Sequence, residues 1–217
     1  MEKGYFITFE GMEGCGKSTQ SRLLAEAFEK AGYNVTLDRS PGSTPIAEKL
    51  RKILKEPTPG EKIAPETELL LFGACHSQMV RERILPVLEK GGVFLSDRFC
   101  DSTLAYQGFA RGLGADAVKW INSYACGNCH PDLTILLDLP PEKGIERAVV
   151  RSGKENGNIA EDRFDSETIS FHKKVREAFL AMAEEEKERF IVVDAAMCIE
   201  GIQKKIREEV HVRLGVF

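Results

Sequence analysis

Residues 9–20, FEGMEGCGKSTQ, limit the possible folds more strongly than any other stretch of the chain. They match the pattern G-x-x-x-x-G-K-[ST] at Gly11, Gly16, Lys17 and Ser18. A β-rich run over residues 5–10 precedes the motif, and residues 17–31 carry apolar side chains at helical spacing. In a strand–loop–helix unit, the backbone N–H groups of such a loop converge on phosphate oxygens at the positive end of the helix. We therefore predict a phosphate-binding loop, in which Lys17 supplies a cation and Ser18 a magnesium ligand.

The rest of the chain alternates apolar strands with long helical patterns. The further predicted strands are 35–38, 93–97, 133–138 and 190–194. Such alternation predicts an α/β fold of three layers, with a five-stranded parallel sheet covered by helices on both faces. The site is expected at the carboxyl ends of the strands. Residues 151–164, polar and glycine-bearing, are predicted to form a short lid over it.

Composition narrows the class further. The chain has 217 residues, of which 42% are hydrophobic, so one domain over residues 1–217 is expected. A net charge of −4 disfavours a nucleic-acid surface, and the sequence lacks an apolar run long enough for a membrane helix. The N-terminal residues lack the order of a secretory signal, and six cysteines fit free thiols, so we expect a cytoplasmic protein.

A second anion site is predicted beside the loop. Asp97 ends an apolar strand where a carboxylate can hold magnesium, and Arg98 follows it with a planar guanidinium suited to phosphate. Arg39 follows another strand at the same edge of the sheet. Because the sequence lacks the guanine-reading and transporter signatures of other P-loop proteins, we favour a small-molecule kinase.

Six segments together resemble the thymidylate kinases of the bacterial type. They are FEGMEGCGKSTQ, PGSTPIAEKLR, LLFGACHSQMVRERILPVL, SDRFCDSTLAYQG, PDLTILLDL and EDRFDSETISFHKKVREAFLAMA, and they extend over nearly the whole chain. The resemblance implies the P-loop NTPase fold and transfer of the γ-phosphoryl group of ATP to dTMP, with Mg²⁺ as cofactor. It also implies a homodimer, with the helix around residues 66–89 as one candidate surface.

The resemblance assigns roles to individual residues. The catalytic residues are Lys17, Arg98, Asp97, Arg151 and Arg163. The ATP-binding residues are Gly11, Met12, Glu13, Gly14, Cys15, Gly16, Lys17, Ser18 and Thr19, and the magnesium ligands are Ser18 and Asp97. The residues that contact the acceptor nucleotide are Glu13, Arg39, Pro41, Phe72, His76, Arg98, Ser102, Thr103, Tyr106 and Gln107. Gly14 is typical of the subclass that takes its extra catalytic arginines from the lid.

The predicted base pocket departs from the family pattern. His76 stands where the family usually has an arginine that donates to thymine, Cys75 replaces an aspartate, and Ser40 and Ser43 replace a glutamate and a glycine. Neutral histidine has a shorter reach and no permanent charge. Two alternatives to dTMP kinase activity therefore stay open: a preference for dUMP or a 5-modified dUMP, and a nucleotide-binding regulator with little turnover.

Residues 126–132, CGNCHPD, contain the C-x-x-C-H pattern of haem attachment. Without an export signal, and in a helix-to-strand connection, the pattern does not favour haem. A zinc site needs about four ligands, and only Cys126, Cys129 and His130 are local. We therefore expect no metal at this segment.

Overall fold

A computed structural model of the chain describes residues 4–56, 60–152, 164 and 167–217. The elements are β1 (Tyr5–Glu10), α1 (Lys17–Lys30), β2 (Val35–Arg39), α2 (Pro45–Lys55), α3 (Pro65–Met79), η1 (Val80–Ile84), α4 (Leu85–Leu88), β3 (Val93–Asp97), α5 (Cys100–Thr103), η2 (Leu104–Ala110), α6 (Ala115–Cys126), β4 (Leu133–Asp138), α7 (Pro141–Ser152), α8 (Ile169–Glu185), β5 (Phe190–Asp194) and α9 (Ile199–Leu214). The two η segments are π-helical. Of the predicted strands, only β2 differs from its expected bounds, since it extends by one residue to Arg39.

The five strands form one parallel sheet in the order β2-β3-β1-β4-β5. β1 lies at the centre, with Phe9 paired to Asp97 of β3 and to Ile135 of β4. Both faces of the central strands are buried, which explains their nearly continuous apolar sequences. The predicted fold is confirmed.

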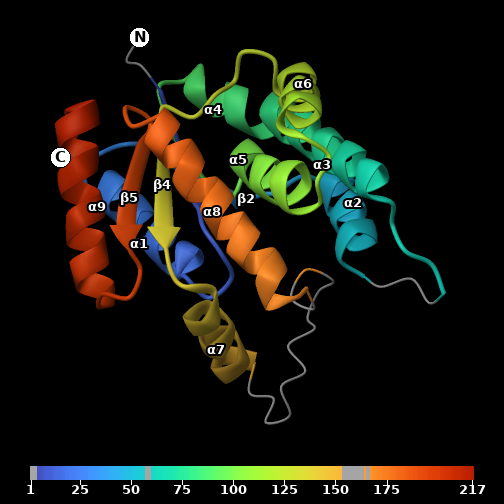
Figure 1. Cartoon of the computed structure of the whole chain (residues 1–217). Coiled ribbons are helices and arrows are strands. Elements are labelled where there is room, and N and C mark those ends of the chain that lie inside the picture. Colours follow the sequence, from blue (N-terminus) through green and yellow to red (C-terminus); the bar gives the residue numbers. More distant parts are fainter. Residues whose placement is uncertain (1–3, 57–59, 153–163, 165–166) are drawn as a thin grey trace.

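Helices cover both faces of the sheet (Figure 1). On one face α1 and α9 pack over a core that includes Leu24, Phe28 and Ile206. On the other face α8 crosses β4 and β5, and the helices α3 and α6 lie beyond η2. This second layer contains two large core clusters, one that includes Tyr106 and Phe179 and the other Phe6, Phe94 and Phe99, and a smaller cluster lies between α2 and α3.

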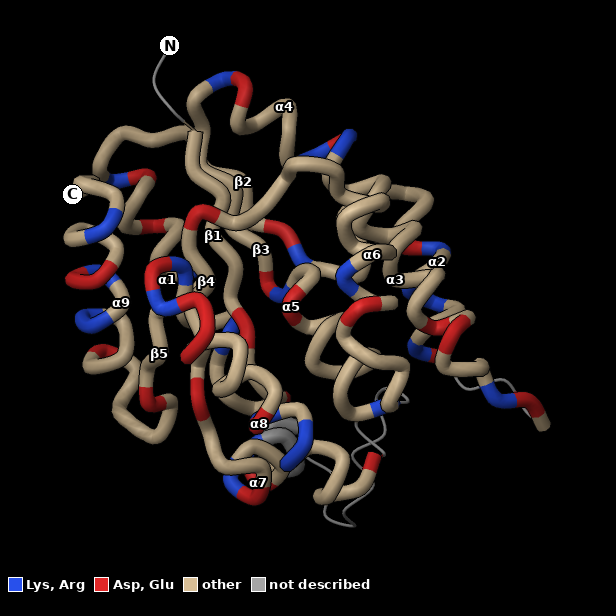
Figure 2. The backbone as a smooth tube through the Cα atoms, turned by 45° about the horizontal axis from the view of Figure 1, so that its top comes forward, with Lys and Arg blue, Asp and Glu red and all other residues tan. Residues whose placement is uncertain are grey.

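The carboxyl ends of the strands define one edge of the molecule. In Figure 1 β4 and β5 point downward, and α7 lies beyond their tips. Charged residues of both signs alternate along α9 (Figure 2). Among the described residues, none of the helices has the length and apolar character needed to cross a membrane.

Candidate active site

The phosphate-binding loop joins β1 to α1, and its lysine is folded inward. Lys17 is buried, and its Nζ donates to the carbonyl oxygens of Gly11, at 3.1 Å, and Met12, at 2.7 Å. The side chains of Met12 and Cys15 pack into the cores on opposite faces of the sheet. The loop is therefore held by two side chains in the interior, while Gly14, Gly16 and Lys17 line the cleft.

Gly14 brings this loop into direct contact with α7. Its backbone has φ +74°, in the left-handed region, and a Cβ placed on it would lie 2.2 Å from the carbonyl oxygen of Gly144. A Cβ on Gly144 would in turn lie 2.5 Å from the carbonyl oxygen of Glu13. Because neither position has room for a side chain, the two glycines allow the backbones of the loop and of α7 to touch.

Glu13 explains why a phosphate-binding loop carries a carboxylate. Its Oε1 accepts a hydrogen bond of 2.7 Å from Arg98 and one of 2.8 Å from the hydroxyl of Tyr106. Burial alone would raise the pKa of Glu13, but Arg98 and Lys17 lower it to about 2. The charged Glu13 therefore orients Arg98 from the side of the loop.

Arg98 occupies a strained position at the carboxyl end of β3. Its φ is +70°, a conformation that is uncommon for residues other than glycine. Its N–H donates to Phe9 O, and its carbonyl oxygen accepts from Ser96 Oγ. These bonds fix the turn, and the guanidinium also donates to Ser102 Oγ at 3.0 Å. The strain is thus maintained where a cation projects into the cleft.

A second carboxylate lies behind Arg98. Glu10 is fully buried, and it accepts hydrogen bonds from the N–H of Phe99 at 2.7 Å and from Ser102 Oγ at 2.6 Å. Burial, and to a lesser degree Asp101, raise its pKa to about 8. Sequence analysis missed Glu10, although its place as the last residue of an apolar strand was a usable signal.

Ser18 and Asp97 meet at the mouth of the loop. The hydroxyl of Ser18 donates to Oδ2 of Asp97 at 2.7 Å, which joins the start of α1 to the end of β3. A hydroxyl and a carboxylate are oxygen ligands of the kind that Mg²⁺ takes, together with water and substrate phosphates. The residues present therefore fit the predicted magnesium site.

One cavity of about 410 Å³ receives the side chains of both predicted anion sites. It is lined by Lys17 and Ser18 of the loop and by Asp97. All ten residues predicted to contact the acceptor also line it. Arg51 and Lys55, four residues apart on α2, and Phe164 were not predicted, yet they line the same cavity.

The far end of the cavity is aromatic. Phe72 of α3 lies 6.0 Å from Phe164, and Phe164 lies 6.2 Å from Tyr106, between ring centroids. Gln107 is buried, and its Nε2 donates to Glu68 at 2.7 Å, while its Oε1 has no partner among the described residues. An unpartnered acceptor in a buried pocket fits a ligand that brings an N–H donor.

His76, the main departure from the family pattern, is neutral. It is 1% exposed, and burial lowers its pKa to about 4. Its Nδ1 lies 3.6 Å from Cys100 Sγ, which leaves only Nε2 for a ligand in the cavity.

The structure gives less support for a site role of three of the predicted arginines. Arg39 lines the cavity but forms an ion pair with Glu48, at 3.1 Å, with its side chain 55% exposed. Arg151 belongs to α7, whose described backbone ends at Ser152. Arg163, and nearly all of the predicted lid, lie outside the described residues.

His172 of α8 was not predicted. It is 2% exposed, and its Nδ1 lies 3.8 Å from Glu13 Oε2. It therefore packs behind the carboxylate that orients Arg98.

A nucleotide-type loop and a second cationic cluster that open into one cavity define a P-loop kinase. Comparison with known proteins specifies which one. The family model for thymidylate kinase matches residues 9–206. A thymidylate kinase of Geobacter sulfurreducens is 48% identical over 198 residues, which cover 91% of this chain and 92% of the relative. One of Pelobacter propionicus is 46% identical over 207 residues, with 95% and 94% covered.

A solved structure agrees. The crystal structure of thymidylate kinase from Ehrlichia chaffeensis superimposes with a TM-score of 0.75 at 27% identity, covering 96% of this chain and 99% of that one. The chain therefore belongs to the thymidylate kinase family.

Proposed function

We propose that this protein transfers the γ-phosphoryl group of ATP to dTMP and yields ADP and dTDP. One observation carries the proposal: Lys17 of the phosphate-binding loop and Arg98 of the acceptor cluster line the same cavity. Two polyanions can approach end to end only where cations from both sites face a shared space. The family relationship then supplies the identity of the donor and the acceptor.

Phosphoryl transfer asks a protein mainly for alignment and for compensation of charge. Arg98 is held by Glu13, Tyr106 and Ser102, and its guanidinium is proposed to bind the acceptor phosphate. Lys17 moves from its carbonyl partners to the donor phosphates when these enter the loop. Arg151 and Arg163 are proposed to add cationic charge from the lid side.

The hydroxyl of Ser18 and the carboxylate of Asp97 are proposed to hold Mg²⁺ together with the phosphates of ATP. The ion supplies positive charge that offsets the negative charge on the transferring group. Without ligand, the hydroxyl of Ser18 donates to the carboxylate of Asp97 and keeps both oxygens at the mouth of the loop.

The base is proposed to stack on Phe72, with the buried Oε1 of Gln107 available to a pyrimidine N–H. Tyr106 is fixed by its hydrogen bonds to Glu13, and its ring is proposed to crowd the position that a ribose 2′-hydroxyl would take. His76 is neutral and offers one ring nitrogen where the family usually has a cationic arginine. For this reason, a kinase that prefers dUMP or a 5-modified dUMP is the second candidate function.

A panel of acceptors tests the proposal. Steady-state rates of ADP release are measured with Mg²⁺, ATP and each of dTMP, dUMP, a 5-modified dUMP, dCMP and UMP. We expect the highest kcat/KM with dTMP. A higher value with dUMP or its derivative would support the second candidate, and ATP binding without turnover across the panel would indicate a regulator.

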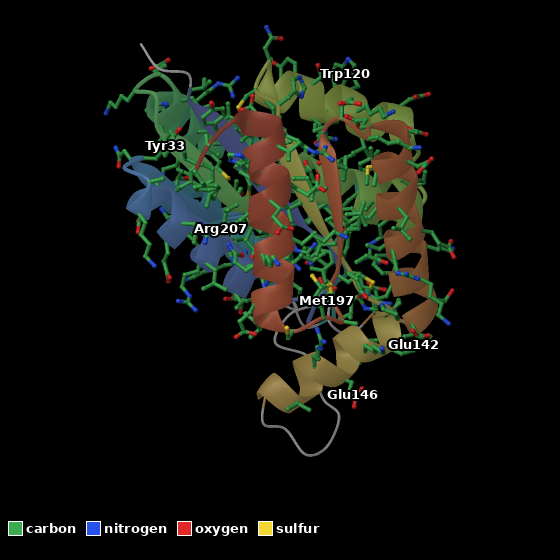
Figure 3. All side chains as sticks on the ribbon, turned by 90° about the vertical axis from the view of Figure 1, so that its left-hand side faces the viewer. Tyr33, Trp120, Glu142, Glu146, Met197 and Arg207 are labelled. Carbon is green, nitrogen blue, oxygen red and sulfur yellow. The ribbon has the colours of Figure 1, made fainter. Side chains whose placement is uncertain are left out.

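We also propose a homodimer that works in the cytoplasm, where ATP is abundant. Trp120 of α6, labelled in Figure 3, is 66% exposed and Tyr124 is 79% exposed. Their rings stack with 5.8 Å between centroids. The neighbouring helix α3 exposes Leu70. Exposed aromatic and aliphatic side chains of this size are typical of interfaces. Sedimentation equilibrium of the wild type and of the W120E/Y124E variant should give a dimer and a monomer, respectively.

A further inference from the structure

Three soft metal-binding side chains meet behind the acceptor pocket, although they are distant in the sequence. They are His76 of α3, Cys100 of α5 and Cys126 of α6, and their ligand atoms all lie within 4.8 Å of one another. The two sulfur atoms are 3.2 Å apart, and Cys100 Sγ is 3.6 Å from His76 Nδ1. His76 and Cys126 are buried, and Cys100 is partly buried.

The two separations, between the sulfur atoms and between Cys100 Sγ and His76 Nδ1, are close to those in a tetrahedral Zn²⁺ site. In a tetrahedral Zn²⁺ site the ligand atoms lie about 3.5–3.8 Å apart, because Zn–S is about 2.3 Å and Zn–N about 2.0–2.1 Å. The sulfur–nitrogen separation already has this value, and the two sulfurs would need to separate by only about 0.5 Å. We propose that His76, Cys100 and Cys126 bind Zn²⁺.

The chain also offers a fourth ligand. Cys129 follows Cys126 with the C-x-x-C spacing of zinc knuckles, and its N–H donates to the carbonyl oxygen of Cys126 at 3.2 Å. Cys129 is 7% exposed and packs in the same core cluster as Cys126. His130, by contrast, is exposed. The sulfur of Cys129 is not among the ligand atoms that lie within 4.8 Å of one another, so its side chain would turn toward the ion to complete a Cys₃His set. The thiol protons leave to solvent as the thiolates form.

Such an ion would connect three helices at the back of the acceptor pocket. Cys100 follows Arg98 by two residues, and the ring of His76 lies 4.9 Å from that of Phe99. Zn²⁺ would therefore fix the orientation of the only side chain that replaces the thymine-reading arginine. The orienting role at His76 rests on the proposed acceptor pocket, whereas Zn²⁺ binding by the cluster can be measured without any phosphoryl transfer.

The test uses the full-length protein, purified under reducing conditions and stripped with a chelator. Zn²⁺ is titrated in competition with a chromophoric chelator, and Co²⁺ is added to a second sample for absorption spectroscopy. We expect about one Zn²⁺ per chain, and a Co²⁺ spectrum with intense visible d–d bands and thiolate charge-transfer bands in the ultraviolet. C100S and C126S should lose at least tenfold in affinity, whereas C198S, which changes an exposed cysteine on the other face, should bind as the wild type.

A further variant and two further measurements can also support or overturn the zinc site. C129S should weaken binding and reduce the thiolate charge-transfer intensity of Co²⁺; unchanged binding would overturn the assignment of the fourth ligand. Binding of less than about 0.1 Zn²⁺ per folded chain, or a weak octahedral Co²⁺ spectrum, would overturn the site itself. So would a Cys100–Cys126 disulfide in protein freshly isolated from cells under conditions that trap thiols. Because the Co²⁺ spectrum is recorded on the wild type, the result does not depend on the folding of any variant.

Discussion

Replacing Gly14 by alanine tests the contact between the phosphate-binding loop and α7. The new Cβ would lie 2.2 Å from the carbonyl oxygen of Gly144, so one of the two backbones must retreat by about 1 Å or more. The left-handed conformation adds a cost of about 1–2 kcal/mol for any residue with a Cβ. Overpacking against a backbone atom costs about 1–3 kcal/mol. We therefore expect G14A to lower the free energy of unfolding by about 2–5 kcal/mol.

Gly112 provides a matched control. Its φ of +82° is also left-handed, but a Cβ there meets nothing within 4 Å. G112A should thus lower the free energy of unfolding only by the cost of the left-handed backbone, about 1–2 kcal/mol. The difference between the two variants isolates the clash with Gly144.

Urea denaturation of the ligand-free proteins, followed by circular dichroism, measures both variants. Equal slopes of the transition would show that the compactness of the unfolded state is unchanged. If G14A and G112A lose the same stability, to within about 0.5 kcal/mol, then the loop does not touch α7 as described and the steric argument is wrong.

Three further predictions concern the carboxylates and the arginine of the cleft. Arg98→Lys removes the planar guanidinium that contacts Glu13, Tyr106 and Ser102. In steady-state assays, kcat/KM for the acceptor should fall about 10- to 100-fold. A value near that of the wild type would argue against phosphate binding by Arg98. Glu13→Gln leaves the guanidinium of Arg98 without its counter-ion, and the free energy of unfolding at neutral pH should fall by about 3 kcal/mol in urea titrations. The difference from the wild type should shrink as the pH falls below 4.5 and vanish below about pH 2, where Glu13 of the folded wild type becomes protonated. Glu10 has a pKa raised from 4.5 to about 8, so folding favours its protonated form and wild-type stability should fall as the pH rises through this window. Between about pH 6 and pH 9 the wild type should lose about 3 kcal/mol more than Glu10→Gln, whereas Glu185→Gln, which changes an exposed carboxylate, should follow the wild type.

The strands and the phosphate-binding loop could be predicted from the sequence because each depends on local pattern. An apolar run that ends in aspartate, or a glycine loop between a strand and a helix, has its meaning within about a dozen residues. The acceptor residues came from the resemblance, and the structure brings them to one cavity. The catalytic roles assigned to them remain predictions.

What the sequence did not reveal depends on contacts between distant segments. The carboxylate of Glu10 is satisfied by Phe99 and Ser102, and this follows only from the adjacency of β1 and β3, which local pattern does not specify. In the sequence, Gly144 is a helical glycine without a distinguishing pattern, and its close contact with the phosphate-binding loop follows only from the structure. The sequence groups Cys126 only with its neighbours Cys129 and His130, whereas His76 and Cys100 reach it from two other helices.

The π-helical segment η2 constrains how this protein can vary over time. It carries Tyr106 and Gln107, and the N–H of Arg111 bonds to the carbonyl oxygen of Tyr106, five residues earlier. A wide turn of this kind holds one residue more than an α-helical turn, and an α-helix rotates by about 100° per residue. Loss of a single residue between 104 and 110 would turn the positions of Tyr106 and Gln107 away from the cleft, even if every remaining side chain were kept. The number of residues in this segment therefore matters to the cleft as much as their identity does.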